Sequence, residues 1–308
     1  MRILFVRSGN NGIDPISTLQ GQSLSQLGVE IFYFDVIGRG FFGYLKNIRP
    51  LRKYIKDVRP DIVHAHYSFC GFISLLTFSG FPIITSLMGS DINSDKIFRG
   101  LIKLCSLMCW KEVIVKSREM KEKIRVRESR VIPNGVDVEK FYVVPKNEAR
   151  DFLNWELEKK IILFAANPCR YEKNWPLAKL AIENLNRTVD VKTLTNISIE
   201  EMVYHYNGAD VILLTSLWEG SPNVIKEAMA CNCPIVTTDV GDVRKIIGGT
   251  KGCFVVKQDA REIAKKLNDI LSSNNRTEGR NRIIKKGLDS NTVAMKLIEI
   301  YETHSKIS

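Results

Sequence analysis

The sequence predicts an α/β protein with two doubly wound domains, each built on a parallel sheet. Short apolar runs that suit buried strands alternate with helix-length amphipathic stretches through both halves of the chain, which is the pattern of βαβ units. The length of 308 residues suits two domains with a core each. A polar stretch that begins at Val144-Pro145 marks the seam. We therefore expect domains over 1–145 and 146–290, followed by a last helix within 291–308.

The expected elements of the first half alternate regularly. Apolar runs rich in Ile and Val predict strands over 3–6, 29–36, 61–65, 83–87, 113–115 and 130–132. Apolar residues at helical spacing predict helices over 16–27, 44–56, 69–78, 96–109 and 117–124.

The second half repeats this rhythm. Strands are expected over 161–165, 189–194, 211–214, 234–237 and 252–256. Helices are expected to begin near Trp175, Ile199, Pro222, Ala260 and Asn291. Because ligands of such sheets bind beyond the carboxyl ends of the strands, the residues that follow each strand are the candidates for a site.

The composition is that of a soluble globular protein, with 44% hydrophobic and 26% charged residues. No apolar run reaches the ~20 residues of a membrane span, and the apolar start of the chain is too short for a signal peptide. We expect a cytoplasmic protein. The seven cysteines lack the spacing of a metal site and are expected to be buried thiols.

The positive charge is concentrated in the first half of the chain. The net charge is +11, of which residues 1–145 contribute +8 and the remainder +3. Solvated helix faces and an anionic membrane surface at the inner membrane face are both consistent with this excess. Nucleic acid is not expected, because no nucleic-acid module or stacking motif is visible.

The stretch from Val211 to Ala230 is the most informative part of the sequence. An apolar strand leads into a polar turn that holds Glu219. Pro222 then stands where a first helical residue would, with Ser221 as the expected N-cap. Glu227 lies on the helix that follows, roughly 7.5 Å further along the axis.

The two glutamates enclose a helix start. Free backbone N–H groups near 221–225 lie between Glu219 and Glu227, and this arrangement suits an anion with hydroxyls on either side, such as a nucleotide sugar. Taken alone, such a pair is more often solvated surface charge. A helical wheel predicts a core face of Val224, Ile225, Ala228 and Met229, and a polar face of Asn223, Lys226, Glu227 and Ala230. On that polar face, Glu227 is expected to serve ligand affinity more than folding.

The run from Glu219 to Glu227 resembles the Glu-x7-Glu signature of retaining glycosyltransferases of family 4, which have the GT-B fold. The resemblance covers nearly the whole chain. It implies two Rossmann-like domains that face each other across a cleft, and a terminal helix that crosses back to the first domain. It also implies that a hexose-type sugar moves from a nucleoside diphosphate sugar to a glycan or lipid-linked acceptor in polysaccharide synthesis, without a divalent metal.

The resemblance assigns roles on the donor side. Glu227 is expected to hold the ribose hydroxyls and Glu219 the sugar, and the backbone that cradles the diphosphate is expected at Gly220, Ser221, Pro222, Asn223 and Val224. Lys173 matches the family's diphosphate lysine. The arginine that many members carry five residues before the lysine is replaced by Pro168, and Arg170 fits the spacing of other members.

Further matches lie outside this stretch. Ile132–Asp137 matches the family's inter-domain turn, and 237–241 its strand-end pattern. Alternation along the strand over 61–65 puts His64 and His66 on one face; His66 is expected to contact donor or acceptor, and His64 to be structural. Asp91 is a candidate for the acceptor side, and Gly12 for a glycine-containing loop near the donor.

Met88 departs from the family, since a histidine is common at this position. Together with Pro168 it leaves an alternative open, namely a catalytically silent sugar- or nucleotide-binding subunit of the same fold. A phosphorylase or epimerase on this fold is a weaker alternative, which no motif supports.

Overall fold

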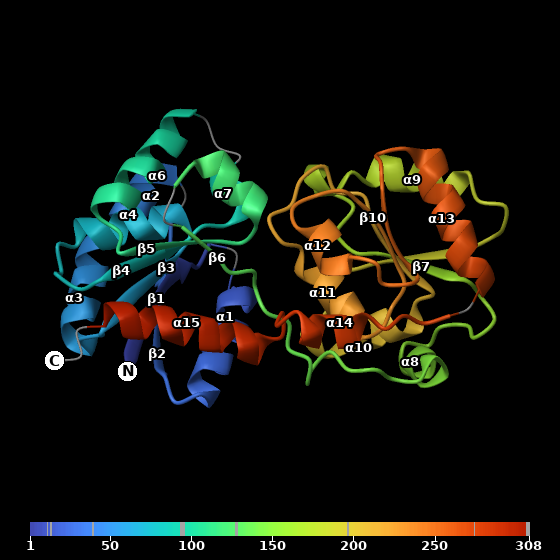
Figure 1. Cartoon of the computed structure of the whole chain (residues 1–308), viewed down its shortest axis with the longest axis horizontal. Helices are drawn as coiled ribbons and strands as arrows, with labels where there is room; N and C mark the ends of the chain where they lie inside the picture. The colour runs from blue at the N-terminus through green and yellow to red at the C-terminus, as the bar shows by residue number, and fades with distance from the viewer. Residues whose placement is uncertain are drawn as a thin grey trace. The chain divides into compact units, whose positions relative to one another are not determined.

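The computed structural model describes residues 1–10, 12, 14–38, 40–92, 96–126, 129–195, 197–273 and 275–305. The chain forms two compact units, one of Met1–Gly135 with Ser290–Ser308 and one of Val136–Asp289. Each is an α/β unit on a parallel sheet, as the sequence predicts (Figure 1). Within the described ranges, no helix is long and apolar enough to cross a membrane.

The sheet of the first unit has six parallel strands in the order β2-β1-β3-β4-β5-β6. They are β1 (Arg2–Ser8), β2 (Glu30–Val36), β3 (Ile62–His66), β4 (Ile83–Ser86), β5 (Glu112–Val115) and β6 (Arg130–Val131). Buried side chains alternate between its two faces: Leu4 and Val6 belong to one core cluster, Ile3 and Phe5 to another. Both faces are therefore covered, as parallel sheets require.

Eight helices of the first unit lie within the described residues. They are α1 (Pro15–Gln26), α2 (Gly40–Leu45), α3 (Ile48–Val58), α4 (Ser68–Leu76), α5 (Gly89–Ile92), α6 (Lys96–Met108), α7 (Arg118–Ile124) and α15 (Ser290–His304). Asp14 caps α1 by accepting from the N–H groups of Ile16 and Ser17. The last of these helices, α15, packs beside α1 on the face of Ile3 and Phe5 (Figure 1).

The second unit has five parallel strands in the order β11-β10-β9-β7-β8. They are β7 (Ile161–Phe164), β8 (Asp190–Thr193), β9 (Val211–Leu214), β10 (Ile235–Thr238) and β11 (Cys253–Val256). Its helices, in the part of the chain that is described, are α8 (Lys146–Phe152), α9 (Trp175–Glu183), α10 (Ile199–Gly208), α11 (Asn223–Ala230), α12 (Val243–Ile247), α13 (Ala260–Ser273) and α14 (Gly279–Lys285), with a 3-10 turn η1 (Tyr171–Lys173). One face of the sheet packs against α10, α11, α12 and α14, and the other against α9 and α13.

The seam lies ten residues before the place that the sequence suggests. The units divide after Gly135, because Val136, Phe141 and Val144 are buried in the core of the second unit. The turn over Ile132–Asp137 leads into this junction, where Val136 pairs with Asp289. Five of the seven cysteines are buried as expected, whereas Cys109 and Cys169 are exposed.

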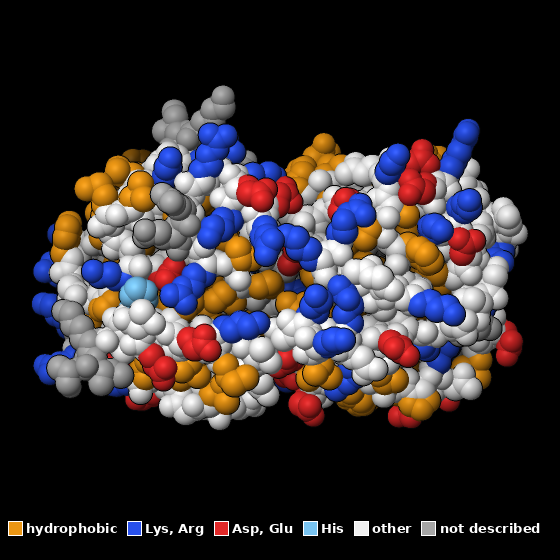
Figure 2. All heavy atoms as spheres, viewed as in Figure 1, with side chains coloured by type: hydrophobic (Ala, Val, Ile, Leu, Met, Phe, Trp, Pro, Cys, Tyr) orange, Lys and Arg blue, Asp and Glu red, His pale blue; other side chains and the backbone are white. Residues whose placement is uncertain are grey.

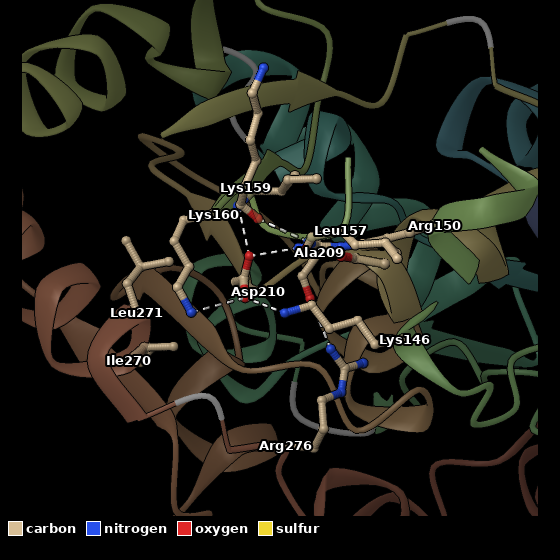
Figure 3. A network of polar contacts seen from close by, with 12 residues as sticks. Lys146, Arg150, Leu157, Lys159, Lys160, Ala209, Asp210, Ile270, Leu271 and Arg276 are labelled. Carbon is tan, nitrogen blue, oxygen red and sulfur yellow. Dashed lines mark hydrogen bonds and ion pairs between the residues drawn. The ribbon is translucent and has the colours of Figure 1, made fainter. Parts of the chain in front are cut away.

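A buried carboxylate fixes the amino ends of β7 and β9. Asp210 accepts hydrogen bonds from the guanidinium of Arg150 at 2.9 Å and from the N–H of Ile161 at 2.7 Å, and Lys146 pairs with its other oxygen (Figure 3). The Arg150 side chain is 1% exposed and also donates to the carbonyls of Gly208, Glu156, Leu157 and Lys159. This network ties α8 to the sheet, at the end opposite to the candidate site.

Candidate active site

Two charged side chains predicted for the site meet at the carboxyl ends of adjacent strands. Lys173 closes η1 after β7, and Glu219 lies in the loop after β9. The Lys173 ammonium donates to a Glu219 oxygen at 2.6 Å, and the Ser216 hydroxyl donates to the same oxygen at 2.8 Å. Both charged side chains are largely buried, with 11% and 16% exposed. The pair is therefore held in place before any ligand binds.

The two loops that carry this pair are tied together through their backbones. The Thr215 hydroxyl donates to the carbonyl of Lys173 at 2.9 Å, and the N–H of Leu217 donates to the carbonyl of Glu172 at 2.8 Å. The Thr238 hydroxyl, at the end of β10, donates to the Ser216 carbonyl. Three neighbouring strand ends thus position one ion pair.

Arg170 does not take part in this arrangement. Its guanidinium forms an ion pair with Glu172, and its side chain is 60% exposed. Among the described contacts, Lys173 is the cation that meets Glu219.

The loop between Glu219 and α11 differs in one respect from the prediction. The helix begins at Asn223, Pro222 occupies the N-cap position, and no side chain caps the helix. The first-turn N–H groups of such a helix have no intrahelical partner. Ser221 is not the N-cap: its hydroxyl donates to Asp242 at 2.8 Å and accepts from the Lys226 ammonium at 3.0 Å.

The polar face predicted for α11 is wrong for two residues. Lys226 and Ala230 are both 0% exposed. Lys226 is covered because the chain after β10 folds over the start of the helix. At the positive φ of Gly241 (56°), an added Cβ would lie 2.6 Å from the Gly220 carbonyl oxygen, so only glycine permits this approach.

Burial shifts the pKa values of the two charged residues that contact the Ser221 hydroxyl, Lys226 and Asp242. It lowers the pKa of Lys226 to about 8, against the nearby carboxylates of Asp242 and Glu227, which oppose the shift. Burial also raises the pKa of Asp242. A cation with a lowered pKa therefore lies directly under the loop that presents Ser221.

The lowered pKa of Lys226 predicts a pH dependence of stability. Between about pH 8 and the ordinary lysine value of 10.5, the unfolded chain keeps a proton that the folded chain has lost, so stability rises with pH. The free energy of unfolding of the wild type relative to Lys226→Met should therefore increase across this window by roughly 1–3 kcal/mol. Urea titrations of both proteins at each pH measure it. A constant difference between them would contradict the buried, perturbed lysine.

Glu227 has a buried partner that the sequence does not indicate. Its carboxylate accepts a hydrogen bond from the Tyr206 hydroxyl at 2.7 Å, and Tyr206 is 0% exposed on α10. Burial raises the pKa of Glu227. The expectation that Glu227 serves binding more than folding is therefore corrected for truncation to alanine, since the loss of the carboxylate also leaves a buried hydroxyl without this acceptor.

In the first unit, His64 and His66 lie on one face of β3, as alternation predicts, with rings stacked at 4.4 Å. His64 is structural: its ring nitrogens bond the hydroxyls of Tyr301 and Ser86 at 2.6 and 2.9 Å. His66 is 2% exposed, and among the described residues neither of its ring nitrogens has a partner. Burial, with His64 and nearby cations adding to it, lowers the pKa of His66 far below the ordinary value, so the ring is neutral.

Asp91 is buried and engaged in internal hydrogen bonds. Its carboxylate accepts from the N–H of Ser68 at 3.0 Å, from the Ser68 hydroxyl and from the N–H of Met88. It thereby holds the start of α4 against the loop after β4. Burial raises the pKa of Asp91 to about 6. Gly12 has a positive φ of 81°, and a Cβ added there would meet no described atom within 4 Å; its neighbours at 11 and 13 lie outside the described residues.

Sequence reasoning missed four residues of the site: Ser216, Tyr206, Lys226 and Asp242. Ser216 stands three residues before Glu219, and a hydroxyl beside a candidate carboxylate is a signal that could have been used. Tyr206 and Asp242 come from other elements, and the sequence carries no local signal for their contacts.

Two family profiles match the chain, one on each unit. "Glycosyltransferase Family 4" matches residues 21–140, and "Glycosyl transferases group 1" matches residues 172–289. The second match begins at η1 and contains Lys173, Glu219 and Glu227.

Three curated relatives are named as bacterial glycosyltransferases. TuaC of Bacillus subtilis, named for teichuronic acid biosynthesis, is 26% identical over 69% of this chain, and the match spans 61% of TuaC. CapM of Staphylococcus aureus, a capsular polysaccharide biosynthesis glycosyltransferase, is 23% identical over 100% of this chain and 94% of its own length. An Escherichia coli UDP-Gal:α-D-GlcNAc-diphosphoundecaprenol α-1,3-galactosyltransferase is 24% identical over 74% of this chain and 68% of its own.

Solved structures share the fold. A sucrose-phosphate synthase from Thermosynechococcus elongatus superposes with a TM-score of 0.82 at 17% identity, over 98% of both chains. HepE of Anabaena, solved with UDP-glucose, superposes with a TM-score of 0.79 at 15% identity, over 98% of this chain and 100% of its own. With both units matched by family profiles and the two-unit fold shared with these structures, the chain belongs to the GT-B glycosyltransferases of the family 4 type.

Proposed function

We propose that this glycosyltransferase retains anomeric configuration and moves a hexose-type sugar from a nucleoside diphosphate sugar to a glycan or lipid-linked acceptor in cell-surface polysaccharide synthesis. The names of TuaC, CapM and the E. coli galactosyltransferase support the pathway and the acceptor class, and HepE with UDP-glucose supports the donor class. The observation that carries the proposal is the Lys173–Glu219 pair at 2.6 Å beside the uncapped start of α11.

The donor-side roles follow from charge and position. A diphosphate placed at the start of α11 meets the N–H groups of Ser221, Asn223 and Val224 and the positive end of the helix dipole. Lys173, one loop away, adds a cation whose charge the departing diphosphate needs. Glu219, oriented by Lys173 and Ser216, accepts hydrogen bonds from sugar hydroxyls, and Glu227 accepts them from the ribose.

Lys226 complements this arrangement from below the loop. Pro168 removes the arginine that many family members place near the diphosphate, and Arg170 is engaged with Glu172 at the surface. The Lys226 ammonium bonds the Ser221 hydroxyl at 3.0 Å and thereby fixes the loop. We assign Lys226 a positioning role, whereas Arg170 remains a candidate for diphosphate contact only if it leaves Glu172.

The first unit supplies two further candidates. Both ring nitrogens of His66 are buried and have no hydrogen-bond partner among the described residues, which suits a neutral hydrogen-bonding contact to donor or acceptor. Asp91, fully engaged with Ser68 and Met88, acts on the acceptor side through the loop that it holds. Gly12 stays a candidate for close backbone approach to the donor.

A catalytically silent binding subunit is the second candidate, favoured by Pro168 and Met88. The two functions separate in a simple assay, namely donor hydrolysis without acceptor. Slow release of nucleoside diphosphate from a bound donor supports the enzyme. Tight donor binding with no release, with or without a lipid-linked acceptor extract, supports the binding subunit.

Turnover should survive EDTA. Lys173, the α11 dipole and the N–H groups of Ser221, Asn223 and Val224 can neutralise the leaving diphosphate without a divalent ion. The measurement is the rate of nucleoside diphosphate release before and after chelation. Loss of turnover on chelation and its return with manganese would contradict the metal-free mechanism.

Glu227→Gln should weaken nucleotide binding by about 1.5–3 kcal/mol, because a charge-assisted contact to the ribose is lost. The amide oxygen still accepts from Tyr206, so the thermal midpoint should change little. Glu227→Ala should lose both affinity and stability, since the Tyr206 hydroxyl is left buried without an acceptor. Calorimetric titration and thermal melts of both variants, with Tyr206→Phe as the control, test this. Unchanged nucleotide affinity in Glu227→Gln would remove the ribose assignment.

We further propose attachment of this protein to an anionic membrane surface at the inner membrane face. The excess positive charge of residues 1–145 supports it, as does the lipid-linked acceptor in the name of the E. coli relative.

A further inference from the structure

One side of α6 exposes a row of large apolar side chains. We call it the α6 apolar face; it consists of Leu101, Leu104, Leu107 and Met108, which are 45%, 54%, 63% and 76% exposed. Their spacing of three and four residues places them on one side of the helix. The other side holds Phe98, Ile102 and Cys105, which pack into the core of the first unit. The core-facing side already provides the burial that folding requires, so the α6 apolar face is not explained by the packing of the first unit.

The apolar surface extends beyond α6. Phe98 of α6 stacks on Phe69 of α4 at 4.9 Å, so the two helices are neighbours. Just after α4, Phe78 is 77% exposed, and Leu76 in its last turn is 40% exposed. Figure 2 shows hydrophobic side chains gathered where Figure 1 draws α4 and α6.

The charges of α6 are all of one sign. The helix sequence KIFRGLIKLCSLM contains three basic residues and no acidic residue. Lys103 lies one turn before Leu107, at one edge of the α6 apolar face, and Lys111 follows the helix closely. An apolar row flanked by cations is the pattern of a helix that lies in the interface of an anionic bilayer. A second copy of this face is a poorer partner, because its like charges would oppose each other.

We propose that the α6 apolar face inserts into the interfacial layer of an anionic membrane, with Lys103 and Lys111 on lipid phosphates. The proposal rests on the proposed function, since a lipid-linked acceptor resides in such a membrane, and it deepens the electrostatic attachment stated there. It adds a distinct expectation. Salt weakens the contacts of the cations with lipid phosphates but not the burial of the leucines. The fraction of protein bound to anionic vesicles should therefore fall as salt is added and then level off above zero.

The test is sedimentation of the full chain with vesicles of phosphatidylcholine, with and without phosphatidylglycerol. Leu104→Glu/Met108→Glu should lower the partition coefficient on anionic vesicles by about tenfold or more, because two anchors become anions. Leu180→Glu is the matched control, since Leu180 is 51% exposed on a helix of the second unit. It should partition like the wild type. Thermal melts show whether each variant is folded.

Each outcome decides the matter. Loss in the α6 double variant with retention in Leu180→Glu supports the proposal. Equal binding of all three proteins, no binding to anionic vesicles at low salt, or equal binding of the wild type to neutral vesicles overturns it, as does a dimer that the double variant abolishes without change in vesicle binding. Nucleotide affinity is measured on the same proteins. Intact nucleotide binding beside a failed membrane test leaves the proposed function standing, and absent nucleotide binding removes it independently.

Discussion

Lys173→Ala should lower donor turnover by about 10²–10³, the cost of removing one preorganised charge from a leaving group. Two effects combine in this variant. The diphosphate loses a cation, and Glu219 loses the ammonium that holds it at 2.6 Å, which leaves the Ser216 hydroxyl as its remaining described partner. Release of nucleoside diphosphate under saturating donor measures the change. The affinity for the bare nucleoside should be unaffected, because Lys173 serves the diphosphate.

One lysine control and one arginine comparison show whether the loss of turnover is specific to Lys173. Lys179→Ala, on the exposed side of α9 and 67% exposed, should leave turnover unchanged. Arg170→Ala should lose less than Lys173→Ala, because its guanidinium lies at the surface on Glu172. A turnover of Lys173→Ala within a factor of about three of the wild type would contradict the role of Lys173.

Asp210→Asn should lower the free energy of unfolding by about 3–5 kcal/mol, because it leaves the Arg150 guanidinium buried without its anion. Arg150 is 1% exposed and bonds Asp210 at 2.9 Å. The amide is close in size to the carboxylate, so lost packing contributes little. Urea denaturation, with the slope compared between variants, measures the loss.

The matched control is Asp269→Asn. Asp269 forms an ion pair with Lys266 at 3.4 Å, and its side chain is 50% exposed. Exposed pairs contribute about 0–1 kcal/mol, so this variant should unfold like the wild type. A loss in Asp210→Asn no larger than in the control would mean that the network of Figure 3 does not anchor α8.

The fold could be predicted from local pattern because parallel strands that are buried on both faces leave a continuous apolar signal. The strands around Leu4, Val63 and Leu213 lie where the apolar runs indicate. The family and the two parallel-sheet units are confirmed. The observed seam lies before the predicted one because Phe141 and Val144 belong to a core most of whose members lie far along the chain, and the polar stretch after them marks the start of α8 instead.

The proximity of two candidate site residues could be predicted because each is a charged side chain placed directly after a strand. Lys173 and Glu219 each follow a strand, and adjacent parallel strands bring such residues together. The burial of Lys226 could not be predicted, since a helical wheel shows which residues share a side of the helix but not which other segment covers that side. The covering segment is Gly241–Asp242, from a loop after the next strand. The contact between Tyr206 and Glu227 could not be predicted for the same reason, because the Tyr206 hydroxyl reaches Glu227 from another helix, α10.

Calorimetric titration of nucleoside diphosphates and their hexose conjugates into the protein tests the central claim most directly. The donor site assigned to the second unit predicts that at least one nucleoside diphosphate binds the wild type. It predicts about tenfold or more weaker binding to both Lys173→Ala and Glu227→Gln, with Lys179→Ala unchanged. If no nucleotide of any base binds, or if one binds all four proteins equally, the donor does not occupy the site between Lys173 and Glu227.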